Sequence, residues 1–136
     1  MIVDEVMTRN PYRASATASI RQVMRMLVEA DVRHIPIVDG DELVGIVSDR
    51  DFRSVAPILL EDGDIAPGAR KALSLPISSL MSSDVLSVYP ESNLVEVIDL
   101  MIEQKIGAVP VVDPDSSRLV GIVSYVDALR AARDVL

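Results

Sequence analysis

The chain of 136 residues contains no cysteine and no tryptophan, and aromatic residues make up only 3% of it. The absence of cysteine excludes disulfides, thiol nucleophiles and cysteine-bearing zinc sites, and it fits a reducing cytosol. A hydrophobic core has to be built from Val, Ile, Leu, Met and Ala, which the apolar content of 49% allows. With 25% charged residues, the composition is typical of a globular domain rather than of a disordered chain.

Long apolar runs and an excess of positive charge are also lacking. No segment approaches the roughly 18 to 20 consecutive apolar residues that span a bilayer, and the N-terminus lacks the basic start and long apolar stretch of a secretory signal. The net charge of −8 opposes binding to phosphate backbones and anionic lipids. We therefore expect a soluble, cytoplasmic protein that binds neither nucleic acid nor membranes.

Patterns typical of catalysis are absent from the sequence. It shows no Ser-His-acid pattern, no two-histidine metal motif and no glycine-rich phosphate loop, and His34 is its only histidine. The acidic segment 61–64 lacks the ligand spacing of a calcium-binding hand. The sequence thus predicts a protein that is not an enzyme, has no metal site and requires no cofactor.

What the sequence does contain is an internal duplication. The hexapeptide Leu-Val-Gly-Ile-Val-Ser occurs at 43–48 and at 119–124, and in each copy an aspartate follows the serine by three positions. Further matches run at an offset of 74 up to Asp39 and Asp113, and at 76 beyond them. One unit of about 55 residues is therefore written twice, and two facing units with an approximate twofold axis are the natural arrangement.

We place the first repeat at 1–58, a connector at 59–76 and the second repeat at 77–136. The repeats differ in charge, because the first holds seven arginines against nine acidic residues and the second four basic residues against nine acidic ones. A phosphorylated ligand would therefore find most of its cationic contacts in the first repeat.

Each repeat predicts the order β-α-β-β-α, and hence a mixed α/β (α+β) fold with two small sheets packed sheet to sheet. The helices show apolar residues at i, i+3, i+4, i+7 and i+8, ending at Val28 and Ile102, with Ser19 and Asn93 as N-caps. The runs that predict strands are apolar at nearly every position, which favours burial of both faces. The predicted elements are an extended stretch at 12–14, a helix over 20–28, strands at 35–38 and 43–47 and a helix from Asp49; then a helical turn at 69–73, an extended stretch at 85–88, a helix over 94–102, strands at 109–112 and 119–123 and a helix from Tyr125.

Several short motifs recur in order and at the same spacing. They are the openings Val-Met-Thr and Leu-Met-Ser, the segments Ile-Pro-Ile-Val-Asp and Val-Pro-Val-Val-Asp, and the two Gly-Ile-Val-Ser segments. Together they resemble the CBS domain over nearly the whole chain, and specifically the tandem pair called a Bateman module. The resemblance implies a pseudo-twofold pair that binds adenosine-containing ligands in clefts between its repeats and usually forms a symmetric homodimer.

The Ser-x-x-Asp element has a physical reading of its own. A serine at the end of a strand and an aspartate in the first turn of the next helix lie at one helix N-terminus, which favours anionic or hydroxyl-rich ligands. The carboxylate can accept both vicinal hydroxyls of a ribose, and the serine hydroxyl can add a contact. The same spacing is also typical of a capping box. The two roles can coexist, and the duplication within this family pattern favours the ribose role.

The resemblance implies that each cleft combines the Ser-x-x-Asp element of one repeat with the residues before the proline of the other. Two of the residues that this would bring together are Arg33 and Arg50, for which solvated surface charge is an equally good interpretation. The first cleft would hold Ser124, Asp127, Arg33, His34 and Ile35; the second would hold Ser48, Asp51, Gly107, Ala108 and Val109, with Arg50 beside Asp51; Ala14 and Val88 would line the adenine walls.

The expected ligands are AMP, ADP or ATP, with S-adenosylmethionine or NAD(H) as second choices. Binding would shift the relative positions of the repeats, or of two copies in a dimer, and an unknown partner protein would respond to that shift. If the chain is complete, this partner is a separate polypeptide. The alternative is a ligand-free protein that uses the pair as a dimerisation scaffold.

Overall fold

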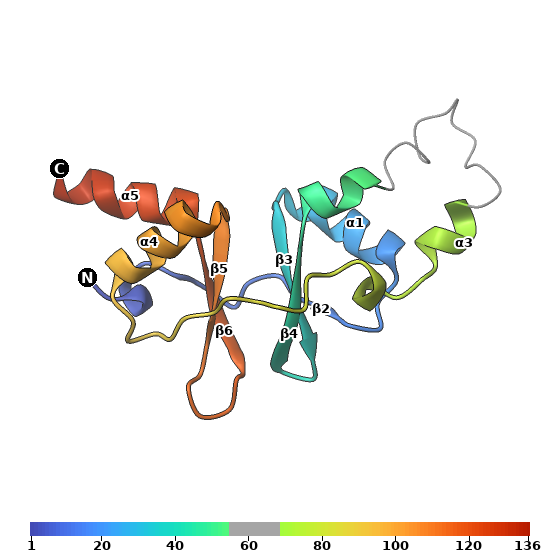
Figure 1. Ribbon diagram of the computed structural model, residues 1–136, viewed down its shortest axis with the longest axis horizontal. Coiled ribbons are helices and arrows are strands. Elements are labelled where there is room, and N and C mark those ends of the chain that lie inside the picture. The colour runs from blue at the N-terminus through green and yellow to red at the C-terminus, as the bar shows by residue number, and fades with distance from the viewer. Residues whose placement is uncertain (55–68) are drawn as a thin grey trace. The chain divides into compact units, whose positions relative to one another are not determined.

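The structure is a computed structural model that describes residues 1–54 and 69–136 (Figure 1). It contains two small three-stranded sheets with helices, the mixed α+β fold that the sequence predicts. The acidic segment 61–64 and most of the connector lie outside the described residues.

The predicted elements are present in the predicted order, with three differences. The extended stretch at 85–88 forms only an isolated bridge through Val88, and a short strand at Thr8–Arg9 was not predicted. In the described part of the first repeat, the second helix is a 3-10 helix. The elements are η1 (Val3–Glu5), β1 (Thr8–Arg9), β2 (Ala14–Ser15), α1 (Ile20–Ala30), β3 (His34–Asp39), β4 (Glu42–Ser48), η2 (Asp49–Ser54), α3 (Ala69–Leu73), η3 (Ile77–Ser79), α4 (Leu94–Gln104), β5 (Ala108–Val112), β6 (Leu119–Ser124) and α5 (Tyr125–Val135).

The helix starts follow the predicted caps. Ser19 accepts a hydrogen bond from the N–H of Gln22 (3.1 Å), and the Gln22 side chain accepts one from the N–H of Ser19 (2.8 Å). Asn93 accepts one from the N–H of Val95 at 3.0 Å. Each cap stabilises the start of its helix by about 1 kcal/mol.

The predicted apolar stripe of these helices is too wide by one position. Its first members are buried, as Ile20 of α1 and Leu94 of α4 show. Its last members are not, because Val28 is 81% exposed and Ile102 is 69% exposed. A residue at i+8 lies about 80° around the helix from residue i, which carries it past the edge of the buried face.

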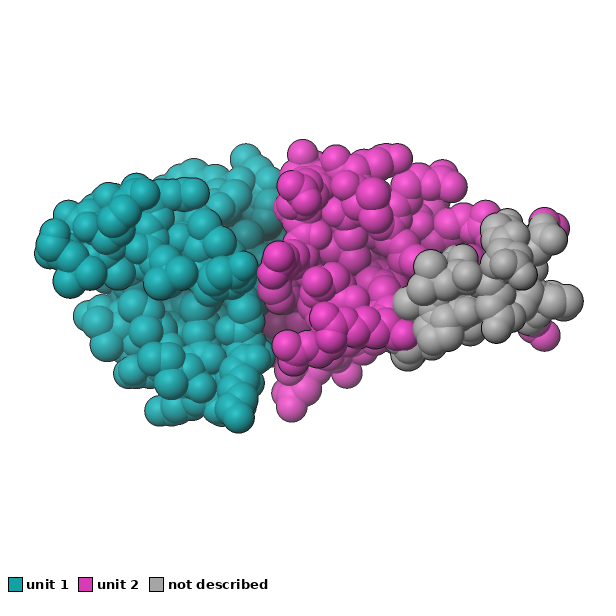
Figure 2. All heavy atoms as spheres, turned by 90° about the horizontal axis from the view of Figure 1, so that it is seen from above, with its two compact units in different colours: residues 1–11, 41–43, 86–136 teal, residues 12–40, 44–85 magenta. Residues whose placement is uncertain are grey.

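The described chain folds into two compact units, coloured separately in Figure 2. Unit 1 comprises residues 1–11, 41–43 and 86–136, and it contains the sheet β1-β6-β5 with α4 and α5. The described residues of unit 2 are 12–40, 44–54 and 69–85, and they contain the sheet β2-β3-β4 with α1 and α3. The units therefore do not coincide with the sequence repeats, because each contains the opening segment of the other repeat.

The opening segments of the two repeats are thus exchanged between the units, and the two exchanged segments make equivalent contacts. Val3, at the start of the first repeat, is fully buried in the core of unit 1, and its counterpart Ile77 is fully buried in the core of unit 2. Strand β1 pairs antiparallel with β6, with Thr8 opposite Ile122. Ile46 likewise forms an antiparallel bridge to Ser82, the counterpart of Thr8.

The glycine of the repeated hexapeptide makes room for the exchanged segment. A Cβ atom at Gly121 would lie 2.6 Å from the sulfur of Met7 and 3.0 Å from the carbonyl oxygen of Thr8. At Gly45 the Cβ would collide in the same way with Met81. Only glycine allows the two backbones to approach so closely.

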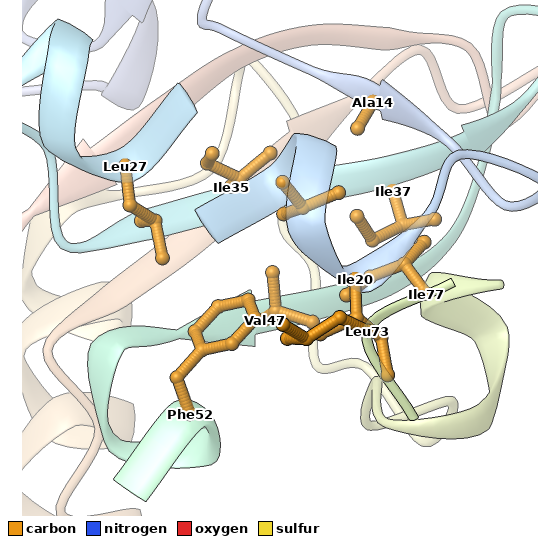
Figure 3. Packing of buried hydrophobic residues seen from close by; sticks show 10 residues of the cluster. Ala14, Ile20, Leu27, Ile35, Ile37, Val47, Phe52, Leu73 and Ile77 are labelled. Atoms are coloured by element: carbon orange, nitrogen blue, oxygen red, sulfur yellow. The ribbon is translucent and has the colours of Figure 1, made fainter. Parts of the chain in front are cut away.

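The two cores consist almost entirely of aliphatic residues, as the composition predicts. Ile20 and Leu27 of α1 belong to one buried cluster with residues of β3 and with Phe52, and Figure 3 shows Ile20 near Leu73 and Ile77. All five residues of β5 and the four from Ile35 to Val38 are buried, as their apolar runs predict. No polar or charged residue is buried among those described.

Candidate functional site

In unit 1, the Ser-x-x-Asp element forms a corner at the junction of β6 and α5. The N–H and the hydroxyl of Ser124 both donate to Oδ2 of Asp127, at 2.9 and 3.0 Å, and the N–H of Asp127 donates to Oγ of Ser124 at 3.2 Å. The capping-box interpretation is therefore confirmed here. The Asp127 side chain is only 10% exposed, so the corner holds a nearly buried carboxylate at a helix start.

The two oxygens of this carboxylate have different surroundings. Oδ2 accepts the serine hydrogen bonds and a further one from Oγ1 of Thr8 at 3.4 Å. Oδ1 lies 3.8 Å from a guanidinium nitrogen of Arg130, whose side chain is largely exposed. A carboxylate offers about four lone-pair positions. Asp127 thus retains acceptor capacity on the side of Oδ1 while Oδ2 fixes its orientation.

In unit 2, β4 and η2 form the equivalent corner. The N–H of Ser48 donates to Oδ2 of Asp51 at 2.8 Å, and the Ser48 hydroxyl donates to the same oxygen at 3.4 Å. Both residues are half-buried. Neither aspartate therefore points into bulk solvent. Full exposure of both carboxylates would have excluded a ligand-binding role.

Each corner is also tied to the residue that precedes β3 or β5, the first of the two longer strands of its own repeat. The N–H of Asp49 donates to the carbonyl of Arg33, and the N–H of Tyr125 donates to the carbonyl of Gly107, both at 2.9 Å. Within unit 2 this brings His34 beside the Ser48 corner, and within unit 1 it brings Ala108 beside the Ser124 corner.

The two corners differ in charge. The unit 2 corner carries Arg33, His34, Asp49 and Arg50, whereas the equivalent positions in unit 1 are Gly107, Ala108, Tyr125 and Val126. Arg33 and Arg50 are exposed, and His34 is half-buried. The corners can therefore present similar contacts to a ribose but very different contacts to a phosphate.

The pKa of the histidine at the unit 2 corner is shifted mainly by burial. Burial lowers the pKa of His34 below its ordinary value of 6.5. The negative charges of Asp49 and, more weakly, Asp51 raise this pKa. The positive charges of Arg33 and, more weakly, Arg50 lower it further. His34 is therefore neutral in the folded chain near pH 7.

The remaining predicted residues lie in strands, except Val88, which forms an isolated bridge to β5. Ile35 and Val109 are fully buried, each in the central run of its strand. Ala14 is buried in β2, which runs parallel to β3, and Val88 is buried and bridges in parallel to Val111. Ala14 and Val88 are thus structurally equivalent.

Sequence reasoning missed two residues at the unit 1 corner. Thr8 reaches Asp127 because its segment is exchanged into unit 1, and Arg130 approaches it from the next turn of α5. The helical spacing of Asp127 and Arg130 was a signal for the second contact. The match of Met7-Thr8 with Met81-Ser82 marked Thr8 as a repeat position but not as a neighbour of Asp127.

The described residues offer neither a metal-binding cluster nor a membrane-spanning helix. In residues 1–54 and 69–136, no three or more His, Cys, Asp or Glu side chains are grouped so that they could hold a metal ion. Within the same ranges, no helix is both long and apolar enough to cross a membrane.

Comparison with known proteins identifies the family. The model of the CBS domain family matches residues 3–58 and again 77–134. The chain therefore belongs to the CBS domain family and carries two copies of the domain.

Similar solved structures are CBS-pair proteins. The structure of CBSX2 in complex with AMP is 29% identical with a TM-score of 0.82, and the match covers 98% of this chain and 97% of that one. The CBS domain pair of protein MJ0100, in complex with 5′-methylthioadenosine and S-adenosyl-L-methionine, is 27% identical with a TM-score of 0.80, over 100% of this chain and 98% of that one.

Among curated relatives, protein MJ1225 of Methanocaldococcus jannaschii is 27% identical over 130 residues, which are 95% of this chain and 46% of that protein. The chain thus spans less than half the length of this relative.

Proposed function

We propose that the chain is a cytoplasmic regulatory module that binds an adenosine-containing nucleotide at its Ser-x-x-Asp corners and signals to a partner protein. AMP, ADP and ATP are the first choices, followed by S-adenosylmethionine and NAD(H). The observation that carries the proposal is the duplicated corner, in which a serine orients a partly buried aspartate at a helix start.

The chemistry of the corner supports a sugar ligand. A carboxylate whose orientation is already set by its own serine loses little entropy when it accepts ligand hydroxyls, which favours binding. Aliphatic neighbours such as Val88 and Ala108 are suited to the face of a base. The relatives in complex with AMP and with S-adenosyl-L-methionine indicate that adenosine is the part to test first.

The pairing of each corner with residues of the other repeat stays a prediction. On that prediction, Arg33 and His34 supply phosphate contacts to the ligand that Ser124 and Asp127 hold by its ribose. The second ligand, held by Ser48 and Asp51, would meet the small residues Gly107 and Ala108 instead.

Thermal unfolding in the presence of ligands tests the proposal. A ligand at 100 times its dissociation constant stabilises the folded state by about 2.7 kcal/mol. We expect at least one of AMP, ADP, ATP, S-adenosylmethionine and NADH to raise the melting temperature in a concentration-dependent way. No shift with any of them would favour the ligand-free scaffold.

Substitution of the aspartates tests the site. Asp127→Asn and Asp51→Asn keep an oxygen that can accept the serine N–H, so the fold should persist, while each loses the charge that binds ribose hydroxyls. We expect each variant to weaken one binding event at least about tenfold in calorimetric titration.

Asp113→Asn is the matched control. Its carboxylate also accepts backbone N–H groups, from Asp115 at 2.8 Å and Ser116 at 3.2 Å, but it lies at the opposite end of β5 from the corner. If both corner variants bind as tightly as this control, the ribose assignment is wrong.

We also propose that the chain forms a homodimer through its helices. The exposed apolar residues of α4 and α5 support this, since Val95, Ile102 and Leu129 are 60%, 69% and 64% exposed. Clusters of exposed large apolar side chains are typical of interaction sites. Light scattering that detects only monomer would contradict it.

A further inference from the structure

Two repeat-equivalent methionines hold the exchanged opening segments against the glycines of the repeated hexapeptide. Met7 packs against the core of unit 1 and Met81 against the core of unit 2, and both side chains are partly buried. At Gly121 a Cβ atom would lie 2.6 Å from the Met7 sulfur, and at Gly45 it would collide with the Met81 sulfur. Each thioether therefore fills the space that the missing glycine side chain leaves.

A backbone carbonyl oxygen lies in each of these contacts. That of Thr8 would be 3.0 Å from a Cβ atom at Gly121, and that of Ser82 would be 3.1 Å from one at Gly45. The Ser82 carbonyl already accepts the N–H of Ile46 at 3.0 Å. An oxygen atom added to either sulfur on its glycine side would thus lack room and would meet a second hydrogen-bond acceptor.

Methionine is the only sulfur-containing residue type in the chain, since cysteine is absent. A peroxide therefore finds no thiol to oxidise first. The thioether sulfur attacks one oxygen of hydrogen peroxide, an S–O bond forms as the O–O bond breaks, and the other oxygen leaves as water with both protons. The sulfur gives up two electrons to the peroxide, and a flexible apolar side chain becomes a polar sulfoxide.

We propose that Met7 and Met81 are oxidation sites at which a peroxide releases the exchanged opening segments from the two cores. The sulfoxide leaves its glycine, because its oxygen requires water or a hydrogen-bond donor. Met7 leads directly into β1, which pairs with β6. Met81 precedes Ser82, which exchanges two hydrogen bonds of 3.0 Å with Ile46 of β4. Oxidation at each site therefore loosens the opening segment in one unit.

Oxidation of Met7 also affects the Asp127 corner. Thr8, the next residue, donates from Oγ1 to Oδ2 of Asp127 at 3.4 Å. Displacement of β1 removes this hydrogen bond, which helps to orient the carboxylate. Nucleotide binding at this corner is then weaker in the oxidised chain, a consequence that rests on the proposed function.

Peroxide treatment followed by thermal unfolding without ligand tests the release of the segments. Peptide mass spectrometry first establishes that Met7 and Met81 have each gained one oxygen atom. We expect the oxidised chain to melt at least about 3 °C below the untreated chain. The amide hydrogens of β4 and β6 should exchange faster. Both changes should reverse after treatment with both classes of methionine sulfoxide reductase, because each class reduces one sulfoxide epimer.

A chain with Met7→Leu and Met81→Leu identifies the responsible sulfurs. Leucine has a similar volume and carries no sulfur, so this double variant should fold. We expect peroxide to lower its melting temperature by less than half as much as that of the original chain. Met24→Leu with Met101→Leu is the matched control, since these side chains are also partly buried and packed against the two cores. The control should lose as much stability as the original chain.

Glutamine substitutions give a second result that requires no oxidant. Met7→Gln places a polar group against Gly121, so β6 should lose more hydrogen-exchange protection than β4. Met81→Gln should give the reverse pattern. Equal protection in both variants and in the original chain would overturn the proposal. So would uptake of oxygen at both methionines without a lower melting temperature, or an equal loss of stability in the leucine variant and its control.

Calorimetric titration with AMP separates these results from the proposed function. We expect Met7→Gln to bind AMP at least about threefold more weakly than the original chain. Equal binding by both chains would show that Met7 does not act on the Asp127 corner. An original chain that binds no adenine nucleotide would overturn the proposed function alone, because the melting and exchange measurements contain no ligand.

Discussion

At the scale of single residues, the Ser-x-x-Asp element at the start of α5 is a helix cap whose carboxylate can accept further hydrogen bonds. The spacing alone predicted a capping box or a ribose site, and the structure confirms the cap at Ser124 and Asp127. The cap uses Oδ2 of the aspartate and leaves acceptor capacity at Oδ1. Capping is therefore compatible with the proposed ribose contact, because it leaves this oxygen able to accept further hydrogen bonds.

The lowered pKa of His34 predicts a pH dependence of stability. Between this lowered pKa and the unfolded value of about 6.5, the unfolded chain binds more protons than the folded chain, so stability falls as the pH falls through this window. The contribution is fully present above about pH 6.5. We expect urea unfolding at about pH 7.5 and pH 5.5 to show a smaller loss of stability for His34→Gln than for the original chain. Equal losses in both proteins would show that His34 is not responsible.

At the scale of elements, local signals were sufficient to predict most helices and strands. Caps, apolar spacing and β-branched runs lie within a few residues of the element they specify, as Ser19 does for α1. The exchange of the opening segments was not predicted, because Val3 and Ile77 have the same sequence context whichever core receives them. Only contacts between distant segments decide which core that is.

The exchange predicts where core substitutions act. Ile77→Ala should cost about 2 to 5 kcal/mol by leaving a cavity in unit 2, although the residue belongs to the second repeat. Hydrogen exchange should then show greater loss of protection in α1 and β3 than in α4 and β5. Val3→Ala should give the reverse pattern. Loss of protection in the residue's own repeat for both variants would contradict the exchange.

At the scale of the whole molecule, the two repeats share a fold but differ in charge. Arginine is concentrated in the first repeat, and unit 2 presents it both at the Ser48 corner and on α1. Duplication of the sequence therefore does not produce two equivalent corners. Arg33 and Arg50 flank the Ser48 corner, whereas the equivalent positions at the Ser124 corner are Gly107 and Val126.

A double-mutant cycle tests which corner Arg33 serves. If Arg33 contacts the phosphate of the ligand held by Asp127, Arg33→Gln should weaken AMP binding about tenfold in the parent chain and have little further effect in Asp127→Asn. It should keep its full effect in Asp51→Asn. The opposite dependence, measured by calorimetric titration, would assign Arg33 to the Ser48 corner of its own unit.

The sequence by itself determined the duplication, the order of elements, the aliphatic cores and the capping serines, because each depends on residues close together in the chain or on composition. It also predicted the family that the comparisons confirm. Only the tertiary structure decided that the opening segments are exchanged, that Thr8 joins the Asp127 corner, and that Val28 and Ile102 are exposed. These features depend on which distant surfaces meet, since burial and hydrogen bonding between segments are properties of the packed chain rather than of any local pattern.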